Sequence, residues 1–254
     1  METKQHSKDK DSRIYDTPYG SVPSVTTCLG LKDKSGALMG WAVKMMAEYL
    51  KTLADSKGTI TIKKEEADEI FKKAKARHKE IKTQSAELGS AVHNLIEVYL
   101  KNQPVDGLLE ADKRLIKPFE AFKLWQSEHK FELVESERQV CSHLKYAGTL
   151  DCICKLDDKM TLLDIKSSNA IYDEMFWQIS AYKECAEHGK AYNGTEWVDC
   201  NYDIERLGIL RLGKEDGLPE WKEITLLEAK ECQDAFMCLC SLWHIINRNK
   251  KEKS

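Results

Sequence analysis

Residues 146–168, YAGTLDCICKLDDKMTLLDIKSS, contain two apolar runs joined by the polar tip LDDK. Both runs are rich in residues that favour strands, and a two-residue turn at Asp157 and Asp158 would join them into a hairpin. Residues that face each other across such a turn have numbers with a constant sum. We therefore expect Asp151 and Asp164 to be direct neighbours across the hairpin.

Two facing carboxylates repel each other and raise each other's pKa, so the pair needs a cation. Lys166 is expected on the same face as Asp164, because it lies two residues further along the strand. A hard divalent ion such as Mg²⁺ or Mn²⁺ would supply the remaining positive charge. The alternative is an exposed hairpin with an ordinary surface pair. Ile153 and Leu162 on the same face argue against free solvation.

Length and composition predict an ordinary globular domain. The chain has 254 residues, 42% hydrophobic and 32% charged, and no apolar run long enough to cross a membrane. Its first dozen residues lack an apolar signal segment, so we expect a cytoplasmic protein whose nine cysteines are reduced. The net charge of −3 argues weakly against a nucleic-acid binder but leaves room for one basic groove.

The order of the expected elements indicates a mixed α/β (α+β) fold, with a central mixed sheet flanked by helices. Residues 13–27 read as extended and turn structure. Strands are expected at residues 131–139, 146–156, 160–167, 206–212 and 221–224. Helices are expected at about residues 37–53, 64–100, 111–129, 172–187 and 227–247, with a kink or split at Pro118. We expect one domain over residues 1–254, with tails at 1–12 and 248–254.

Several short motifs occur in a fixed order along the chain. They are VPSVTT at 22–27, ELGSAVH at 87–93, GTLD at 148–151, DIK at 164–166 and QISAY at 178–182. Together they resemble the PD-(D/E)XK nuclease superfamily in its RecB-type exonuclease branch, with phage-encoded members as the nearest match. The resemblance implies a restriction-endonuclease-like core at residues 130–247, with the helical part at 13–129 arching over it.

The resemblance also implies roles for individual residues. Asp151, Asp164, the carbonyl of Ile165 and His93 would be metal ligands, Lys166 would orient the attacking water, and Gln178 and Tyr182 would line the site. Glu137 is a further candidate, because the family often carries an acid there. From the residues alone, His93 also fits a core histidine, and Gln178 with Tyr182 also fits a packing pair one helical turn apart.

The implied function is a deoxyribonuclease, with exonucleolytic action more strongly indicated than endonucleolytic action. It would use one or two Mg²⁺ or Mn²⁺ ions, leave 5′-phosphates, and serve phage-type recombination or repair in the host cytoplasm. Its partners would be single- or double-stranded DNA ends, with a recombination or single-strand-binding protein as a further candidate. The alternatives are an endonuclease of the same fold and a catalytically inactive nucleic-acid-binding module.

Some RecB-type relatives hold an iron–sulfur cluster with one upstream cysteine and three near the C-terminus. This chain has Cys28, Cys232, Cys238 and Cys240, but no Cys-x-x-Cys spacing. The last three fall on an expected helix among apolar residues. We therefore interpret all four as core thiols and expect no cluster.

Overall fold

The computed structural model describes residues 13–251 and divides the chain into two compact units. Residues 33–90 form the smaller unit, and the described residues on either side of them form the larger unit. Compact units can belong to one domain, so the single domain expected over residues 1–254 stays a prediction. The expected tails at 1–12 and 252–254 lie outside the described residues. Where a tail was expected from residue 248, a helix continues to Lys251.

The larger unit is built on a mixed sheet, which has seven strands among the described residues in the order β7-β6-β3-β4-β5-β8-β9. All neighbouring strands are antiparallel except β5 and β8, which are parallel. The fold class expected from the sequence is therefore confirmed. The strands are β3 (Phe131–Ser142), β4 (Tyr146–Leu156), β5 (Lys159–Lys166), β6 (Lys190–Tyr192), β7 (Trp197–Asp199), β8 (Arg206–Leu212) and β9 (Pro219–Ile224).

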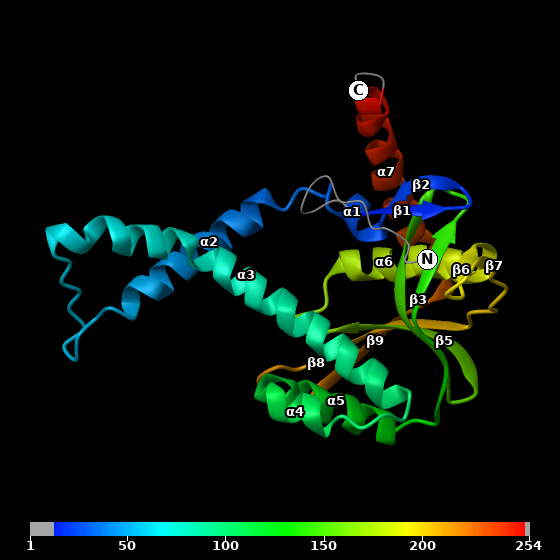
Figure 1. Cartoon of the computed structure of the whole chain (residues 1–254), viewed down its shortest axis with the longest axis horizontal. Helices are drawn as coiled ribbons and strands as arrows, with labels where there is room; N and C mark the ends of the chain where they lie inside the picture. The colour runs from blue at the N-terminus through cyan, green and yellow to red at the C-terminus, as the bar shows by residue number, and fades with distance from the viewer. Residues whose placement is uncertain (1–12, 252–254) are drawn as a thin grey trace. The chain divides into compact units, whose positions relative to one another are not determined.

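Helices cover both faces of the central strands (Figure 1). Helix α6 (Asp173–His188) contacts β3, β4, β5 and β8, and α7 (Leu226–Lys251) packs on α6. Helix α5 (Ile116–Ser127) contacts β8 and β9. Because both faces are covered, β8 is buried along most of its length, as expected for a strand in the parallel part of a sheet.

After α3 (Lys64–Leu100), one helix was expected over about residues 111–129, with a kink or a split at Pro118. It is split into α4 (Asp106–Ala111), a 3₁₀ turn η1 (Lys113–Leu115) and α5. Pro118 lies in the first turn of α5, where a missing backbone N–H costs no helical hydrogen bond. The break lies at Asp112 and α5 continues through Pro118, so the interruption was predicted at the wrong residue.

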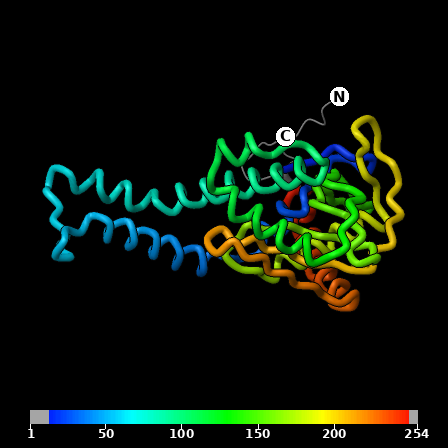
Figure 2. The backbone as a smooth tube through the Cα atoms, turned by 90° about the horizontal axis from the view of Figure 1, so that it is seen from below, coloured from blue at the N-terminus to red at the C-terminus, as the bar shows by residue number. Residues whose placement is uncertain are grey.

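The smaller unit consists of α2 (Ser35–Lys51) and the first part of α3, which run side by side (Figure 2). The ring of Trp41 meets the ring of His78 edge-on, with centroids 6.3 Å apart. Helix α2 was expected two residues later than it begins, and the bounds of α3 match those expected.

The predicted hairpin is confirmed, including its register. The β4–β5 pairing runs from Leu156 opposite Lys159 to Cys152 opposite Leu163, so every pair has the expected sum. Asp157 and Asp158 both have positive φ, 52° and 67°, as a tight turn between twisted strands requires. The Asp151–Asp164 pair lies one step beyond this register.

The segment 13–27 contains more structure than its turn residues indicated. Strands β1 (Ile14–Thr17) and β2 (Gly20–Pro23) pair antiparallel, and a short helix α1 (Val25–Leu29) follows. Ser24 begins this helix, because its side chain accepts the N–H of Thr27. The helix was missed because five residues carry too little periodicity to reveal it. Its capping serine was the available signal.

Gly148 lets α6 approach β4 closely. A Cβ at this position would lie 2.7 Å from both Cε1 and the hydroxyl of Tyr182, which is itself buried. Two of the motifs found in the sequence, GTLD and QISAY, are therefore in direct contact. This contact fixes the distance between helix α6 and the strand that carries Asp151.

Replacing Gly148 with alanine should destabilise the protein by about 2 kcal/mol, because the added methyl overpacks against the Tyr182 ring. The midpoint of urea unfolding would measure the loss. Gly107→Ala is the matched control, since a Cβ there meets nothing within 4 Å and the residue lies in α4. Equal midpoints for the two variants would contradict the proposed close contact.

Candidate metal centre

Three side chains from three elements converge beside the central strands of the sheet. His93 comes from α3, Glu137 from β3 and Asp151 from β4, and one ligand atom of each lies within 4.8 Å of the other two. His93 Nδ1 is 3.4 Å from Glu137 Oε1 and 3.4 Å from Asp151 Oδ1. Nitrogen and carboxylate oxygens at these distances form a donor set that a divalent cation could occupy.

Glu137 reaches this position through the pairing of β3 with β4. Ser136 pairs with Cys152 and Arg138 pairs with Leu150, so Glu137 is the residue opposite Asp151. Its φ of 48° is in the left-handed region, which a residue with a Cβ adopts at a cost of about 1 kcal/mol or more. Glu137, a further candidate from the sequence, therefore belongs to the cluster with His93 and Asp151.

Asp164 and Lys166 form a buried ion pair beside this cluster. Lys166 Nζ lies 2.6 Å from Asp164 Oδ2, and the aspartate is 1% exposed. Burial raises the pKa of Asp164 to about 6, although the Lys166 ammonium opposes the rise. Neither carboxylate oxygen of Asp164 has a well-aligned hydrogen-bond donor among the described residues, so the ion pair is its only direct compensation there.

The backbone after Asp164 also contributes to the cluster. The N–H of Ile165 donates to Asp151 Oδ2 at 2.7 Å. Burial opposes the charge of Asp151, but His93, Lys166 and this N–H outweigh it and hold the pKa of Asp151 below its usual value. Asp151 is therefore an ionised carboxylate at neutral pH. The carbonyl of Ile165 as a metal ligand stays a prediction.

His93 carries a positive charge in the metal-free protein. Burial disfavours its charged form, but the carboxylates of Asp151 and Glu137 outweigh burial and raise the pKa of His93 to about 10. Because Nδ1 faces both carboxylates, an imidazolium proton lies where a cation would bind. Binding of a metal by this nitrogen must therefore release a proton.

Gln178 and Tyr182 lie on α6 next to the acidic groups. Burial raises the pKa of the Tyr182 hydroxyl, the negative charges of Asp151 and Asp164 add to that rise, and the Gln178 side chain opposes it. Tyr182 is buried and Gln178 is half-buried. The helix therefore places one hydroxyl and one amide beside the two aspartates, as their one-turn spacing predicts.

The residues present fit a divalent ion. Three carboxylates, from Glu137, Asp151 and Asp164, face a single permanent positive charge on Lys166, which leaves two negative charges for a cation to balance. Asp164 is buried with incomplete hydrogen bonding. A buried carboxylate in that condition is unfavourable unless a charge partner compensates it. The carboxylates and the imidazole could hold a divalent cation, and Mg²⁺ or Mn²⁺ as that ion stays a prediction.

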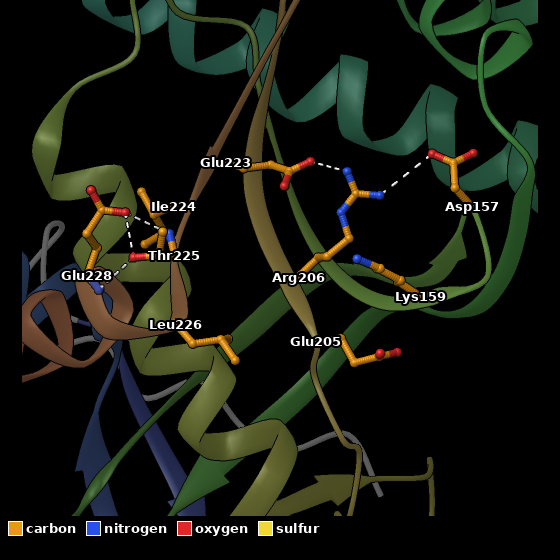
Figure 3. Close-up of a pocket in the computed structure, with 9 residues that line it drawn as sticks. All are labelled: Asp157, Lys159, Glu205, Arg206, Glu223, Ile224, Thr225, Leu226 and Glu228. Atoms are coloured by element: carbon orange, nitrogen blue, oxygen red, sulfur yellow. Dashed lines mark hydrogen bonds and ion pairs between the residues drawn. The ribbon is translucent and has the colours of Figure 1, made fainter.

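A cavity of about 540 Å³ lies at the opposite end of β5, away from this centre (Figure 3). Arg206 bridges Asp157 and Glu223 there, and Glu228 accepts the backbone N–H of Thr225 at the start of α7. Glu205 accepts the backbone N–H of Met160, so each of the four carboxylates in the lining has an ion-pair or hydrogen-bond partner. The carboxylates of this cavity therefore hold the local fold.

The four cysteines considered for a cluster do not share one environment. Cys28 and Cys240 are buried, Cys232 is half-buried and Cys238 is exposed. Cys28 and Cys240 are within hydrogen-bonding reach, and this contact and burial raise the pKa of Cys28. The interpretation as core thiols is correct for this pair and wrong for Cys238, because residue 238 lies on the outer face of α7.

Comparison with known proteins finds no protein family that matches the chain, and no curated protein matches it significantly. The resemblance to the PD-(D/E)XK nucleases therefore stays a prediction that depends on the motifs and on their arrangement. Among the described residues, no helix is long and apolar enough to span a membrane.

The charge of His93 should make the metal-free protein sensitive to alkali. A pKa raised from about 6.5 to about 10 stabilises the fold fully below pH 6.5, and the stabilisation is lost as the pH rises through 10. The difference in unfolding free energy between wild type and His93→Gln should shrink by roughly 2–4 kcal/mol over this window. Urea unfolding in EDTA would measure it. A difference independent of pH would show that the imidazolium is not paired as described.

Mn²⁺ should raise the melting temperature of the wild-type protein by on the order of 5 °C at saturating concentration, because it binds the folded state alone. Asp151→Asn and Glu137→Gln should each abolish most of this shift. Glu132→Gln is the matched control, because Glu132 is an exposed acid on the same strand as Glu137 and pairs with Lys155. An equal shift in all four proteins would place the ion elsewhere.

Proposed function

We propose that this chain is a metal-dependent nuclease that hydrolyses phosphodiester bonds in DNA. The observation that carries the proposal is the convergence of His93, Glu137 and Asp151 next to the buried Asp164–Lys166 pair. A cluster with uncompensated negative charge and a retained lysine suits a site that must bring a divalent ion and a phosphate together. A purely structural cluster would be less costly with neutral side chains.

The divalent ion, when bound, would supply a water of lowered pKa and would neutralise charge on the phosphate oxygens. His93, Glu137 and Asp151 are the residues with which the protein would hold it, and Asp164 would complete the set. The hydrogen bond from Ile165 N–H fixes the orientation of the Asp151 carboxylate, so its second oxygen faces His93.

Lys166 is suited to stabilise negative charge that develops on the phosphate. Burial disfavours its charge, but Asp164 and Asp151 outweigh burial and raise its pKa, so the amine stays protonated at neutral pH. A fixed ammonium in a half-buried site contributes more to a developing anion than the same group in water. Tyr182 and Gln178 offer a hydroxyl and an amide to the same region.

The finer features of the proposal derive from the family resemblance. These are exonucleolytic action, products with 5′-phosphates, a role in phage-type recombination or repair, and a recombination or single-strand-binding protein as partner. The motifs GTLD, DIK and QISAY, with the upstream His93, support them. In the described structure the same motifs lie around one centre, which is the arrangement that the resemblance requires.

Digestion of end-labelled linear DNA and of circular DNA, with Mg²⁺, Mn²⁺ or EDTA, would test the proposal. We expect degradation of linear DNA only, dependent on the metal. Nicked circles would favour the endonuclease alternative instead. Intact DNA in every metal would contradict hydrolysis and leave the inactive binding module.

Asp164→Asn and Lys166→Met should each reduce the cleavage rate by at least about a hundredfold while the protein stays folded, since the first removes a carboxylate proposed to hold the cation and the second removes the positive charge beside the phosphate. Lys155→Met is the matched control, because Lys155 is an exposed lysine on β4 that pairs with Glu132. Single-turnover cleavage rates and circular dichroism would be compared. A Lys166 variant that cleaves at the wild-type rate would refute its assigned role.

A further inference from the structure

A cavity of about 310 Å³ lies where β5 and β8 end. Ser168 and Asn169 line it from the segment after β5, and Arg211, Lys214, Glu215 and Asp216 line it from the end of β8 and the turn that follows. None of these residues belongs to the candidate metal centre. Several of them carry hydrogen-bond donors of the kind that phosphate groups bind.

The pairing of β5 with β8 places this cavity next to Lys166. Lys166 and Arg211 are partners in the parallel register. Partners on neighbouring parallel strands project from the same face of the sheet and are separated by about 4.8 Å. Lys166 on β5 and Arg211 on β8 are therefore neighbours on one face of the sheet. The cavity adjoins Arg211 at the end of β8.

The donors in the cavity are largely uncommitted. Lys214 is half-buried and makes no ion pair with any described residue, and burial lowers its pKa. Arg211 Nε bonds Glu220 Oε2 at 2.5 Å, and the terminal guanidinium nitrogens are not used in that contact. Asn169 is exposed and offers its amide.

The Asp216 carboxylate and the backbone of Glu215 hold the turn that carries Lys214. Asp216 Oδ1 accepts the N–H of Leu218 at 3.0 Å. A Cβ on Gly213 would lie 1.7 Å from the same oxygen, so glycine is needed for the carboxylate to fold back. The backbone carbonyl of Glu215 accepts the ammonium of Lys117 on α5. These two hydrogen bonds stabilise the turn on which Lys214 lies.

We infer that this cavity binds a phosphate of the nucleic-acid strand close to the bond that is cleaved, with Lys214 as the main contact and Arg211 and Asn169 as further donors. The inference rests on the proposed nuclease function and adds a subsite to it. A lysine with no partner of its own gains most from an anion, and a phosphate bound here would position the strand across Lys166.

Binding of a fluorescent single-stranded oligonucleotide to the full chain with Asp164→Asn, which prevents cleavage, would test the subsite. Adding Lys214→Glu should weaken binding by roughly tenfold. Adding Lys214→Ala should lower the slope of log affinity against log salt by about 0.7, as loss of one phosphate contact predicts. Lys159→Glu is the matched control, because Lys159 lines the cavity at the other end of β5 (Figure 3).

Oligonucleotides with one neutral methylphosphonate linkage would locate the bound phosphate. At one position, the neutral linkage should weaken binding to the protein that retains Lys214. The same linkage should not change the affinity of the Lys214→Ala protein. A comparison of oligonucleotides that carry a 5′-phosphate with those that carry a 5′-hydroxyl distinguishes a terminal from an internal phosphate. A Lys214 effect present with both ends assigns an internal phosphate, and an effect that requires the 5′-phosphate assigns a terminal one.

Equal affinities for the Lys214→Glu and Lys159→Glu proteins would overturn the subsite. If the wild-type chain still cleaved DNA in that case, the proposed nuclease function would stand without the phosphate subsite. A wild-type chain that neither bound nor cleaved any oligonucleotide would overturn both. In the active protein, Lys214→Ala should raise KM by a larger factor than it lowers kcat, because the residue binds a phosphate that flanks the reacting bond and does not touch the bond itself.

Discussion

Repulsion among three carboxylates is the constraint on which the rest of this structure depends. Glu137, Asp151 and Asp164 come from the adjacent strands β3, β4 and β5 and lie close together beside His93 and Lys166. In the metal-free protein the compensation comes from His93 and Lys166, which the same carboxylates keep protonated. The cluster therefore requires nearby cations to be stable, and exchange of the imidazolium proton for a divalent ion changes its net charge from −1 to zero.

Packing around the cluster explains why separate motifs belong together. Gly148 and Asp151 lie on the same strand, so the close approach of Tyr182 to Gly148 also brings α6 near Asp151. A larger residue at 148 would move the helix away and remove Gln178 and Tyr182 from the acidic groups. The glycine and tyrosine of the two motifs are therefore one packing unit, and the aspartate and glutamine extend it into the site.

The sequence predicts the hairpin centre better than it predicts the complete cluster. The DD turn and the alternating strands determine the register, and with it the shared face of Asp164 and Lys166, through local rules alone. The β3–β4 pairing also contains a register shift between Leu133 and Glu135, which periodicity does not reveal. Beyond that shift, Glu137 faces Asp151, so its place in the cluster required the three-dimensional structure.

The strained backbone at Glu137 connects this last point to function. A left-handed residue inside a strand interrupts the regular ladder, and the pairs on both sides, Ser136 with Cys152 and Arg138 with Leu150, hold it in place. Strain of this kind persists only where the surroundings overdetermine it, and it concentrates at sites where a side chain must be aimed. At residue 137 the result is a carboxylate 3.4 Å from His93.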